Sequence, residues 1–257
     1  MTDIAAQAKH LLNQSGSPKR RAVARVCPLL AAGEHKLIGE EGSKIATWRL
    51  EGAQLGGPAV LLVHGWEDDN SLWTPLVDLL QARGKAVVAF DLPGHGYSQG
   101  DACGLELTIQ AIKTIAAELG PIDGVATHSF SGMALARALV EGLDVKSVVL
   151  ISPPARQSGQ FERVWRRFHV AEDVITAALE MGRAEGRFFD LATIAPTMKA
   201  DALFIHSRDD VQCPAEDAKT AAAAWPNAKY YEVDGLGHRN LVKDDEVVAM
   251  AAAWLVG

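Results

Sequence analysis

The chain has 257 residues, of which 48% are hydrophobic and 22% charged, and its formal net charge is -7 at pH 7. This length and composition fit one α/β domain with a sizeable core, and no apolar run approaches the roughly 18 residues of a membrane-spanning helix. Because no long segment has an excess of lysine and arginine, the charge balance argues against nucleic acid or an anionic membrane as partner and favours a small molecule.

The three cysteines, Cys27, Cys103 and Cys213, are widely spaced and odd in number. This spacing fits neither a disulfide framework nor a metal site, and it is typical of a reducing compartment. The first residues lack the basic start and apolar segment of a signal peptide, so we expect a cytoplasmic protein. The eight histidines form no H-E-x-x-H motif or Cys/His cluster, so we expect no metal and no cofactor.

Residues 1–34 are predicted to form an N-terminal extension. Residues 4–14 have weak helical spacing. A break in regular structure is predicted after them, at Ser15 to Pro18 and the basic triplet Lys19 to Arg21. We expect the basic triplet to be a solvated surface rather than a contact for a partner.

The pattern that follows predicts a mostly parallel sheet of about eight strands with helices on both faces, which is an α/β fold. Residues 35–39 and 44–51 are expected to form an antiparallel hairpin, and the continuously apolar run 59–63 is typical of a buried parallel strand. The remaining strands are expected at 86–90, up to 126, and at 145–151, 202–206 and 229–233. The helices between them are expected at 71–83, 105–119, from 131 onward, 215–225 and 240–255.

Residues 155–198 interrupt this alternation and are predicted to be a small helical cap inserted into the core, which comprises residues 35–154 and 199–257. Phe161, Val164, Trp165 and Phe168 lie at helical spacing on one apolar face. Two interpretations remain open for this face. Either Phe161, Trp165 and Phe168 line a substrate pocket, or they pack the insertion onto the domain.

Ser129 lies between an apolar strand and a buried helix, with the small residues Thr127 and Ser131 two positions away on either side. A serine on such a turn is exposed above the sheet edge and faces the N-terminus of the next helix, which favours developing negative charge. The usual pattern is Gly-x-Ser-x-Gly, and this chain has Thr127 and Ser131 in the glycine positions. A helix N-cap without chemistry would also fit these residues, so the assignment depends on neighbouring motifs.

His64-Gly65-Trp66 follows one predicted parallel strand, and the segment 91–98 follows the next. Both lie where open α/β sheets bind ligands, at the carboxyl edge. Together with the turn at Ser129, these stretches resemble the α/β-hydrolase fold superfamily over about residues 35–257. The resemblance implies that the backbone N–H groups of Trp66 and Phe130 form an oxyanion hole, in which each donor contributes about 10²-fold or more in rate.

A nucleophilic serine needs a histidine as base, and this histidine needs a carboxylate. Downstream of Ser129, only His238 lies in a glycine-rich loop directly after a strand, so it is the predicted base, and His169 and His206 are expected to be structural.

The segment Phe204 to Pro214 resembles the part of the family that carries the acid. In this family the acid lies four residues after a histidine and four before a proline. Both counts select Asp210, and Asp209 is the alternative if the loop differs by one residue.

The resemblance therefore implies a carboxylesterase-like serine hydrolase that forms an acyl-Ser129 intermediate, acting on a small-molecule ester or related acyl compound. A thioesterase, a perhydrolase or a C–C bond hydrolase would use the same residues. The loss of both turn glycines instead supports a catalytically silent binding protein on this fold. Glu67, Asp68 and Asp69 are expected to be solvated and to solvate the loop after Trp66, and the alternative is that they narrow the range of anionic substrates. The sequence does not specify the acyl chain, the leaving group or the oligomeric state.

Overall fold

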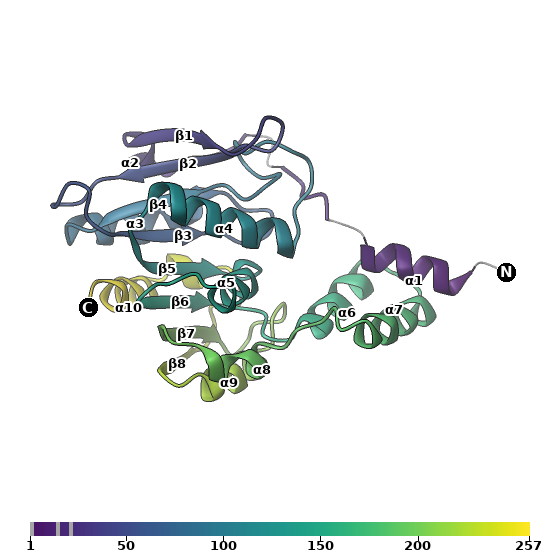
Figure 1. Cartoon of the computed structure of the whole chain (residues 1–257). Helices are drawn as coiled ribbons and strands as arrows, with labels where there is room; N and C mark the ends of the chain where they lie inside the picture. Colours follow the sequence, from purple (N-terminus) through teal and green to yellow (C-terminus); the bar gives the residue numbers. More distant parts are fainter. Residues whose placement is uncertain (1–2, 14–15, 21–22) are drawn as a thin grey trace.

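The computed structural model describes residues 3–13, 16–20 and 23–257 (Figure 1). Ser15 and Arg21, which belong to the predicted break and basic triplet, lie outside the described residues. None of the described helices is long and apolar enough to cross a membrane.

The centre of the fold is one eight-stranded sheet with the order β1-β2-β4-β3-β5-β6-β7-β8. β1 is antiparallel to β2 and β2 is antiparallel to β4, whereas all pairs from β4 to β8 are parallel. The predicted hairpin followed by a parallel sheet is therefore confirmed. The strands are β1 (Glu34–Ile38), β2 (Ile45–Leu50), β3 (Ala59–Val63), β4 (Ala86–Phe90), β5 (Ile122–His128), β6 (Ser147–Ile151), β7 (Asp201–Ser207) and β8 (Ala228–Val233).

Helices cover both faces of the sheet, as the sequence predicts (Figure 1). Side chains of α4, α5, α8 and α9 share one apolar core with the sheet, and those of α2, α3 and α10 share the other. The α-helices are α1 (Ile4–Asn13), α2 (Pro28–Ala31), α3 (Thr74–Ala82), α4 (Leu105–Leu119), α5 (Ser131–Val140), α6 (Gln157–Arg167), α7 (Glu172–Ala184), α8 (Leu191–Ile194), α9 (Ala215–Ala224) and α10 (Asp245–Val256). Three short 3₁₀ helices are η1 (Asn70–Trp73), η2 (Ala195–Thr197) and η3 (Leu241–Lys243).

The continuously apolar strand β3 illustrates why the sheet is buried on both faces. Its side chains alternate, so that Leu61 and Val63 enter the core with α4 and α5, while Val60 and Leu62 enter the core with α3 and α10. All five residues of β3 are buried. A polar side chain on either face would have to be desolvated, which explains the apolar run.

A third apolar cluster lies outside these two cores. Trp165 of α6 packs there with Ile175 of α7 and Ala8 of α1, and Figure 1 shows α1 beside α6 and α7. The predicted helices between residues 155 and 198 are thus present, but they share their core with the first helix of the predicted N-terminal extension. Leu30 of α2 is buried in the sheet's own core. The division of the chain at residues 34, 154 and 198 stays a prediction.

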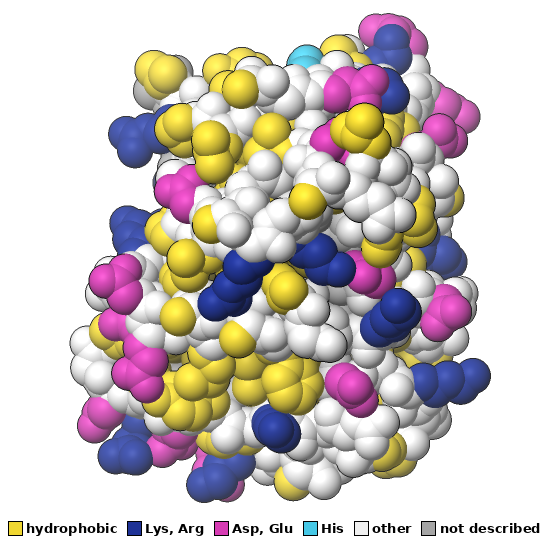
Figure 2. Space-filling view, turned by 90° about the vertical axis from the view of Figure 1, so that its left-hand side faces the viewer, with side chains coloured by type: hydrophobic (Ala, Val, Ile, Leu, Met, Phe, Trp, Pro, Cys, Tyr) yellow, Lys and Arg dark blue, Asp and Glu magenta, His cyan; other side chains and the backbone are white. Residues whose placement is uncertain are grey.

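The two ends of the molecule differ in character. Because β3 to β8 are parallel, the loops after β3, β4, β5, β7 and β8 all emerge at one edge of the sheet, and they carry the residues singled out by the sequence. Figure 2 shows the end of the molecule away from α1, where charged side chains of both signs are scattered among hydrophobic ones.

Candidate active site

Ser129 occupies the turn between β5 and α5 in a left-handed backbone conformation, with a φ of 55°. Its N–H donates to the carbonyl of Ile151 at 2.9 Å, and its own carbonyl accepts from the N–H of Gly132 at 2.9 Å. A left-handed conformation is costly for a residue with a Cβ and persists where neighbouring contacts fix it, which is common at functional sites. The backbone therefore holds Ser129 on the sharp turn predicted for a nucleophile.

The imidazole of His238 joins Ser129 to Asp210. Its Nε2 lies 2.8 Å from Ser129 Oγ, and its Nδ1 lies 2.7 Å from Asp210 Oδ2. The carboxylate accepts a hydrogen bond from Nδ1–H. The proton therefore stays on Nδ1, and the Nε2 lone pair is available to the serine hydroxyl. The structure thus brings together the three residues that the sequence selects from the loops after β5, β7 and β8.

The carboxylate of Asp210 is buried and accepts several hydrogen bonds. Its Oδ1 accepts the backbone N–H groups of Gln212 and Cys213 at 2.8 Å and 2.9 Å, and its Oδ2 lies 3.2 Å from Nε2 of His206. Burial opposes ionisation, but the hydrogen bonds from His206 and His238 outweigh it and hold the pKa of Asp210 well below its usual range. Asp210 is therefore ionised at neutral pH and can stabilise a charged imidazole.

Asp209, the alternative acid, has different contacts. It is exposed, it accepts from the Ser207 hydroxyl, and its Oδ1 accepts the N–H groups of Gly235 and Gly237 at 3.2 Å and 3.1 Å. These bonds fix the glycine-rich loop that precedes His238. Asp210, not Asp209, is the carboxylate that contacts the imidazole.

The two residues predicted to supply the oxyanion donors are in contact. The rings of Trp66 and Phe130 meet edge to face with centroids 5.7 Å apart. Gly65 approaches the turn so closely that a Cβ on it would lie 3.1 Å from the Cβ of Ser129. A side chain at position 65 would therefore require the turn at Ser129 to shift by a few tenths of an ångström.

The loop that contains Trp66 is fixed by His64 and Ser131. The His64 ring donates from Nδ1 to the Gly65 carbonyl at 2.7 Å, and its Nε2 accepts the N–H of Leu92 at 2.9 Å. The hydroxyl of Ser131 donates to the carbonyl of His64. Ser131 stands in a glycine position of the usual turn pattern, and its hydroxyl ties the turn to the loop. The departure from that pattern therefore has a structural role.

A second buried histidine holds the next residue of this loop. Nε2 of His95 accepts the N–H of Glu67 at 2.9 Å, and its Nδ1 donates to the carbonyl of Pro93 at 2.9 Å. This pattern requires a neutral ring with one proton. Burial and, to a smaller extent, the nearby His64 lower the pKa of His95 to about 4. His95 is accordingly neutral near pH 7.

The acids at positions 67–69 are more ordered than we expected. Asp68 and Asp69 are buried, so the prediction that they are solvated is wrong for both. Asp68 forms an ion pair with Arg239 at 2.9 Å, directly after His238, and Asp69 caps η1 by accepting from the N–H of Ser71. A solvated loop and a capped loop have the same acidic composition, and only the tertiary contacts distinguish them.

The described part of the basic triplet lies beside this loop. Lys19 and Arg20 are exposed, as predicted. The N–H of Lys19 donates to Glu67 at 3.1 Å, and the Arg20 guanidinium donates to the carbonyls of Gly96 and Ser98 at 2.8 Å. Residues 19 and 20 therefore fasten the N-terminal segment to the loops after β3 and β4.

Two further residues that contact Asp210 or His238 were not singled out by the sequence. Cys213 is buried, and its backbone N–H donates to Asp210 Oδ1 at 2.9 Å. Nε2 of His128 donates to the carbonyl of His238 at 2.9 Å, which fixes the backbone of that residue. Burial lowers the pKa of His128 to about 3, helped by the neighbouring His238. The sequence offered one indication that His128 belongs to the site, which is that it directly precedes Ser129.

The three cap aromatics lie in different surroundings. Trp165 is buried in the third cluster, Phe161 stacks on it with centroids 5.3 Å apart, and Phe168 is 71% exposed. Of the two interpretations of this face, packing describes Trp165. A role for Phe161, Trp165 or Phe168 in a substrate pocket stays a prediction.

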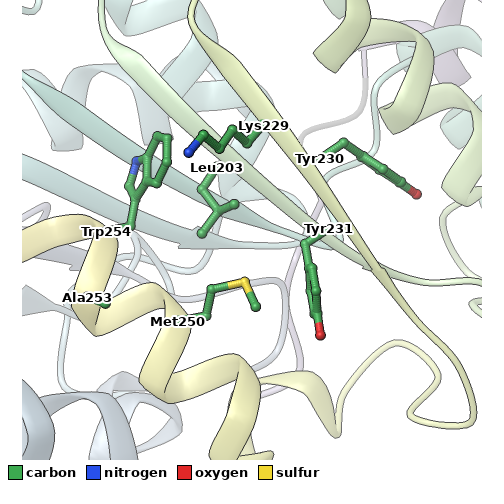
Figure 3. Close-up of a pocket in the computed structure, with 7 residues that line it drawn as sticks. All are labelled: Leu203, Lys229, Tyr230, Tyr231, Met250, Ala253 and Trp254. Carbon is green, nitrogen blue, oxygen red and sulfur yellow. The ribbon is translucent and has the colours of Figure 1, made fainter.

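A groove of about 390 Å³ lies elsewhere, between the edge strand β8 and α10. Figure 3 shows Met250 and Trp254 of α10 facing it together with Tyr231, while Tyr230 projects from the other side of β8. It contains none of the residues around Ser129. Among the described residues, no group of three or more His, Cys, Asp or Glu side chains is arranged to hold a metal ion.

The chain belongs to the alpha/beta hydrolase family, whose sequence model matches residues 60–251. A pimeloyl-[acyl-carrier protein] methyl ester esterase of Xanthomonas axonopodis pv. citri is 26% identical over 225 residues, which cover 71% of this chain and 88% of that protein. The enzyme of the same name from Xylella fastidiosa is 38% identical over 65 residues, or 25% of each chain.

Solved structures show the same fold. An esterase of Pyrococcus furiosus aligns with a TM-score of 0.70 at 19% identity, covering 95% of this chain and 97% of its own. A thermophilic esterase of Thermogutta terrifontis aligns with a TM-score of 0.65 at 19% identity, covering 87% of this chain and 98% of its own. The resemblance inferred from the sequence motifs is thus confirmed, and the family is one of hydrolases.

The Ser131 hydroxyl should contribute measurably to stability. We expect Ser131→Ala to lower the free energy of unfolding by about 1–3 kcal/mol, because the buried carbonyl of His64 loses its donor. The matched control is Ser152→Ala, since the Ser152 hydroxyl is also buried but has no hydrogen-bond partner among the described residues. Urea denaturation measures both variants, and equal losses would contradict the assigned bond.

The buried histidines should make stability depend on pH. The pKa of His95 is lowered to about 4 and that of His128 to about 3, so between pH 6 and 4 the unfolded chain binds two protons that the folded chain does not. Asp91 acts in the opposite sense, since burial raises its pKa to about 6 and the folded chain binds that proton first. For these three groups the net difference is about one proton, so together they should lower the free energy of unfolding by about 1.4 kcal/mol per unit as the pH drops through 5.

Urea denaturation at a series of pH values measures this slope. His95→Gln removes one of the two histidine protons and should reduce the slope by about 1.4 kcal/mol per pH unit, while replacement of the exposed His35 by glutamine should leave it unchanged. An unchanged slope in His95→Gln would show that the ring is not held neutral.

Proposed function

We propose that the protein is a serine hydrolase that cleaves a carboxylic ester through an acyl-Ser129 intermediate. The observation that carries the proposal is the pair of hydrogen bonds of His238, at 2.8 Å to Ser129 Oγ and at 2.7 Å to Asp210 Oδ2. A serine hydroxyl is a weak nucleophile unless a base accepts its proton during attack. In this arrangement Nε2 is that base, and Asp210 fixes the tautomer that leaves Nε2 free.

In the first half of the reaction Ser129 Oγ attacks the ester carbonyl carbon while its proton moves to Nε2 of His238. The carbonyl oxygen becomes an oxyanion, for which the backbone N–H groups of Trp66 and Phe130 are the proposed donors. The C–O bond to the alcohol then breaks. The proton on Nε2 passes to the leaving oxygen, so the alcohol departs neutral and Ser129 carries the acyl group.

In the second half water replaces the alcohol. His238 accepts a proton from the water as its oxygen attacks the acyl carbon, and returns a proton to Ser129 Oγ when the acid is released. The buried carboxylate of Asp210 stabilises the imidazolium in both halves. The names of the relatives favour an ester over a thioester, peroxide or C–C bond as the substrate. The hydrogen bonds that join Ser129, His238 and Asp210 weigh against a catalytically silent binding protein.

We also propose that α6, in the segment 155–198, covers the site as a cap. Oε1 of Gln160 on this helix lies 3.8 Å from the thiol of Cys213, whose backbone N–H donates to Asp210 Oδ1. This contact supports a cap that meets the site through polar residues.

A fluorophosphonate probe tests the nucleophile. It should label the folded protein once, at Ser129, because His238 activates the hydroxyl and the oxyanion donors stabilise the adduct. Intact-mass and peptide mass spectrometry give the number and position of labels, with Ser129→Ala as the blank. A folded protein that stays unlabelled would favour the silent binder, and a label on Ser131 or Ser152 would refute the assigned nucleophile.

The two neighbouring aspartates provide a matched test of the acid. Asp210→Asn should lower kcat by about 10⁴-fold, because an amide at this position selects the tautomer that presents N–H to Ser129. Asp209→Asn keeps an oxygen for the loop N–H groups and should cost less than about tenfold. Initial rates with an activated aryl ester measure both variants. A larger loss at position 209 would assign the acid to Asp209.

A further inference from the structure

The helix α6 places a polar surface next to the loop that carries Asp210. Oε1 of Gln160 lies 3.8 Å from Sγ of Cys213, and the N–H of Cys213 donates to Asp210 Oδ1 at 2.9 Å. The same Oε1 accepts from a terminal nitrogen of Arg163 at 3.0 Å. Contacts through Gln160 and Cys213 thus connect the carboxylate beside His238 to a guanidinium one helical turn along α6.

Arg163 has unused hydrogen-bonding capacity. Its Nε is buried and has no hydrogen-bond partner among the described residues, and none of their carboxylates forms an ion pair with it. Arg166 on the same helix is different, because it pairs with Glu162 and with Glu172 at 2.9 Å. A buried N–H without an acceptor is costly, so it indicates a site that a ligand completes.

Arg163 has no carboxylate partner among the described residues, although a second arginine lies beside it. A Cβ on Gly159 would be 3.4 Å from a nitrogen of both Arg156 and Arg163. Asp217 forms an ion pair with Arg156 at 3.8 Å. Burial and the Asp210 charge raise the pKa of the Cys213 thiol, and the nearby Arg163 charge opposes them.

We propose that Arg163 binds a carboxylate of the substrate, so that the preferred esters carry a second, free carboxyl group. The planar guanidinium can offer Nε–H and a terminal N–H to the two oxygens of one carboxylate. A guanidinium without a carboxylate partner matches a monoanionic carboxylate. Gln160 keeps the guanidinium in position. The inference rests on the proposed function of Ser129 and specifies its substrate class.

Matched aryl esters test the proposal. The charged probes are the nitrophenyl half-esters of succinate, glutarate and adipate, and the neutral probes are nitrophenyl esters of monocarboxylic acids of the same chain lengths. Wild-type protein should show a kcat/KM at least about tenfold higher for the best charged probe than for its neutral partner. Arg163→Gln should reduce the charged value by about tenfold to a hundredfold and the neutral value by less than about twofold.

Arg167→Gln is the control, because it removes the same charge from an exposed position of the same helix. It should leave both values unchanged, and Arg163→Lys should give an intermediate value for the charged probe because it keeps the charge but loses the fork. Equal losses for charged and neutral probes in Arg163→Gln would assign Arg163 to the stability of α6 and overturn the proposal. Wild-type protein without preference for the charged probes would overturn it too, while leaving the esterase activity in place.

A binding measurement separates this proposal from the proposed function. Isothermal titration calorimetry with glutarate and adipate reports the carboxylate site whether or not Ser129 reacts. Binding to wild-type protein that is lost in Arg163→Gln and kept in Arg167→Gln would support the site even if no ester is cleaved and no fluorophosphonate label appears. Absence of binding to wild-type protein together with no charge preference would refute it.

Discussion

The position of one imidazole ring is the constraint on which the site depends. His238 must keep its Nδ1 against Asp210 and its Nε2 against Ser129 at the same time, and each neighbouring contact serves this placement. Asp209 binds the N–H groups of the loop before the ring, and His128 binds the carbonyl of His238 itself. A loop rich in glycine would otherwise be mobile. Its flexibility gives the ring access to the serine, and these hydrogen bonds then fix it there.

Neutral buried histidines do much of the remaining positioning. His64 and His95 each accept one backbone N–H and donate to one carbonyl, so each joins two segments of irregular backbone. A charged ring could not accept, and a methyl group could do neither, which explains imidazoles at buried positions. The low pKa of His95, caused mainly by burial, keeps the ring in the form that this bridging needs. The geometry of the loop that contains Trp66 therefore depends on the protonation of His64 and His95, neither of which takes part in the proposed reaction.

Much of the fold was predictable because hydrophobic periodicity fixes strands and helices locally, as in the apolar run of β3. Asp210 was predictable because the resemblance to the family supplied its spacing to His206 and Pro214. The Ser131 hydroxyl, the buried Asp68 and the packing of Ala8 against Trp165 were not, because each depends on residues far apart in the chain. The sequence shows a small, an acidic and an apolar residue, and only the tertiary neighbours distinguish their roles.

The helix α6 is a second case in which only tertiary neighbours show what a residue does. Its apolar side attracts attention in the sequence, yet Trp165 lies in a cluster with α1 and α7, and Phe161 stacks on Trp165. Because a helix that buries one side in its neighbours presents another to the rest of the molecule, the side with Gln160 and Arg163 meets Cys213. The packing of the N-terminal helix thus determines which side of α6 meets Cys213. The proposed selectivity for a carboxylate would then arise from a polar surface whose orientation is set by an apolar one.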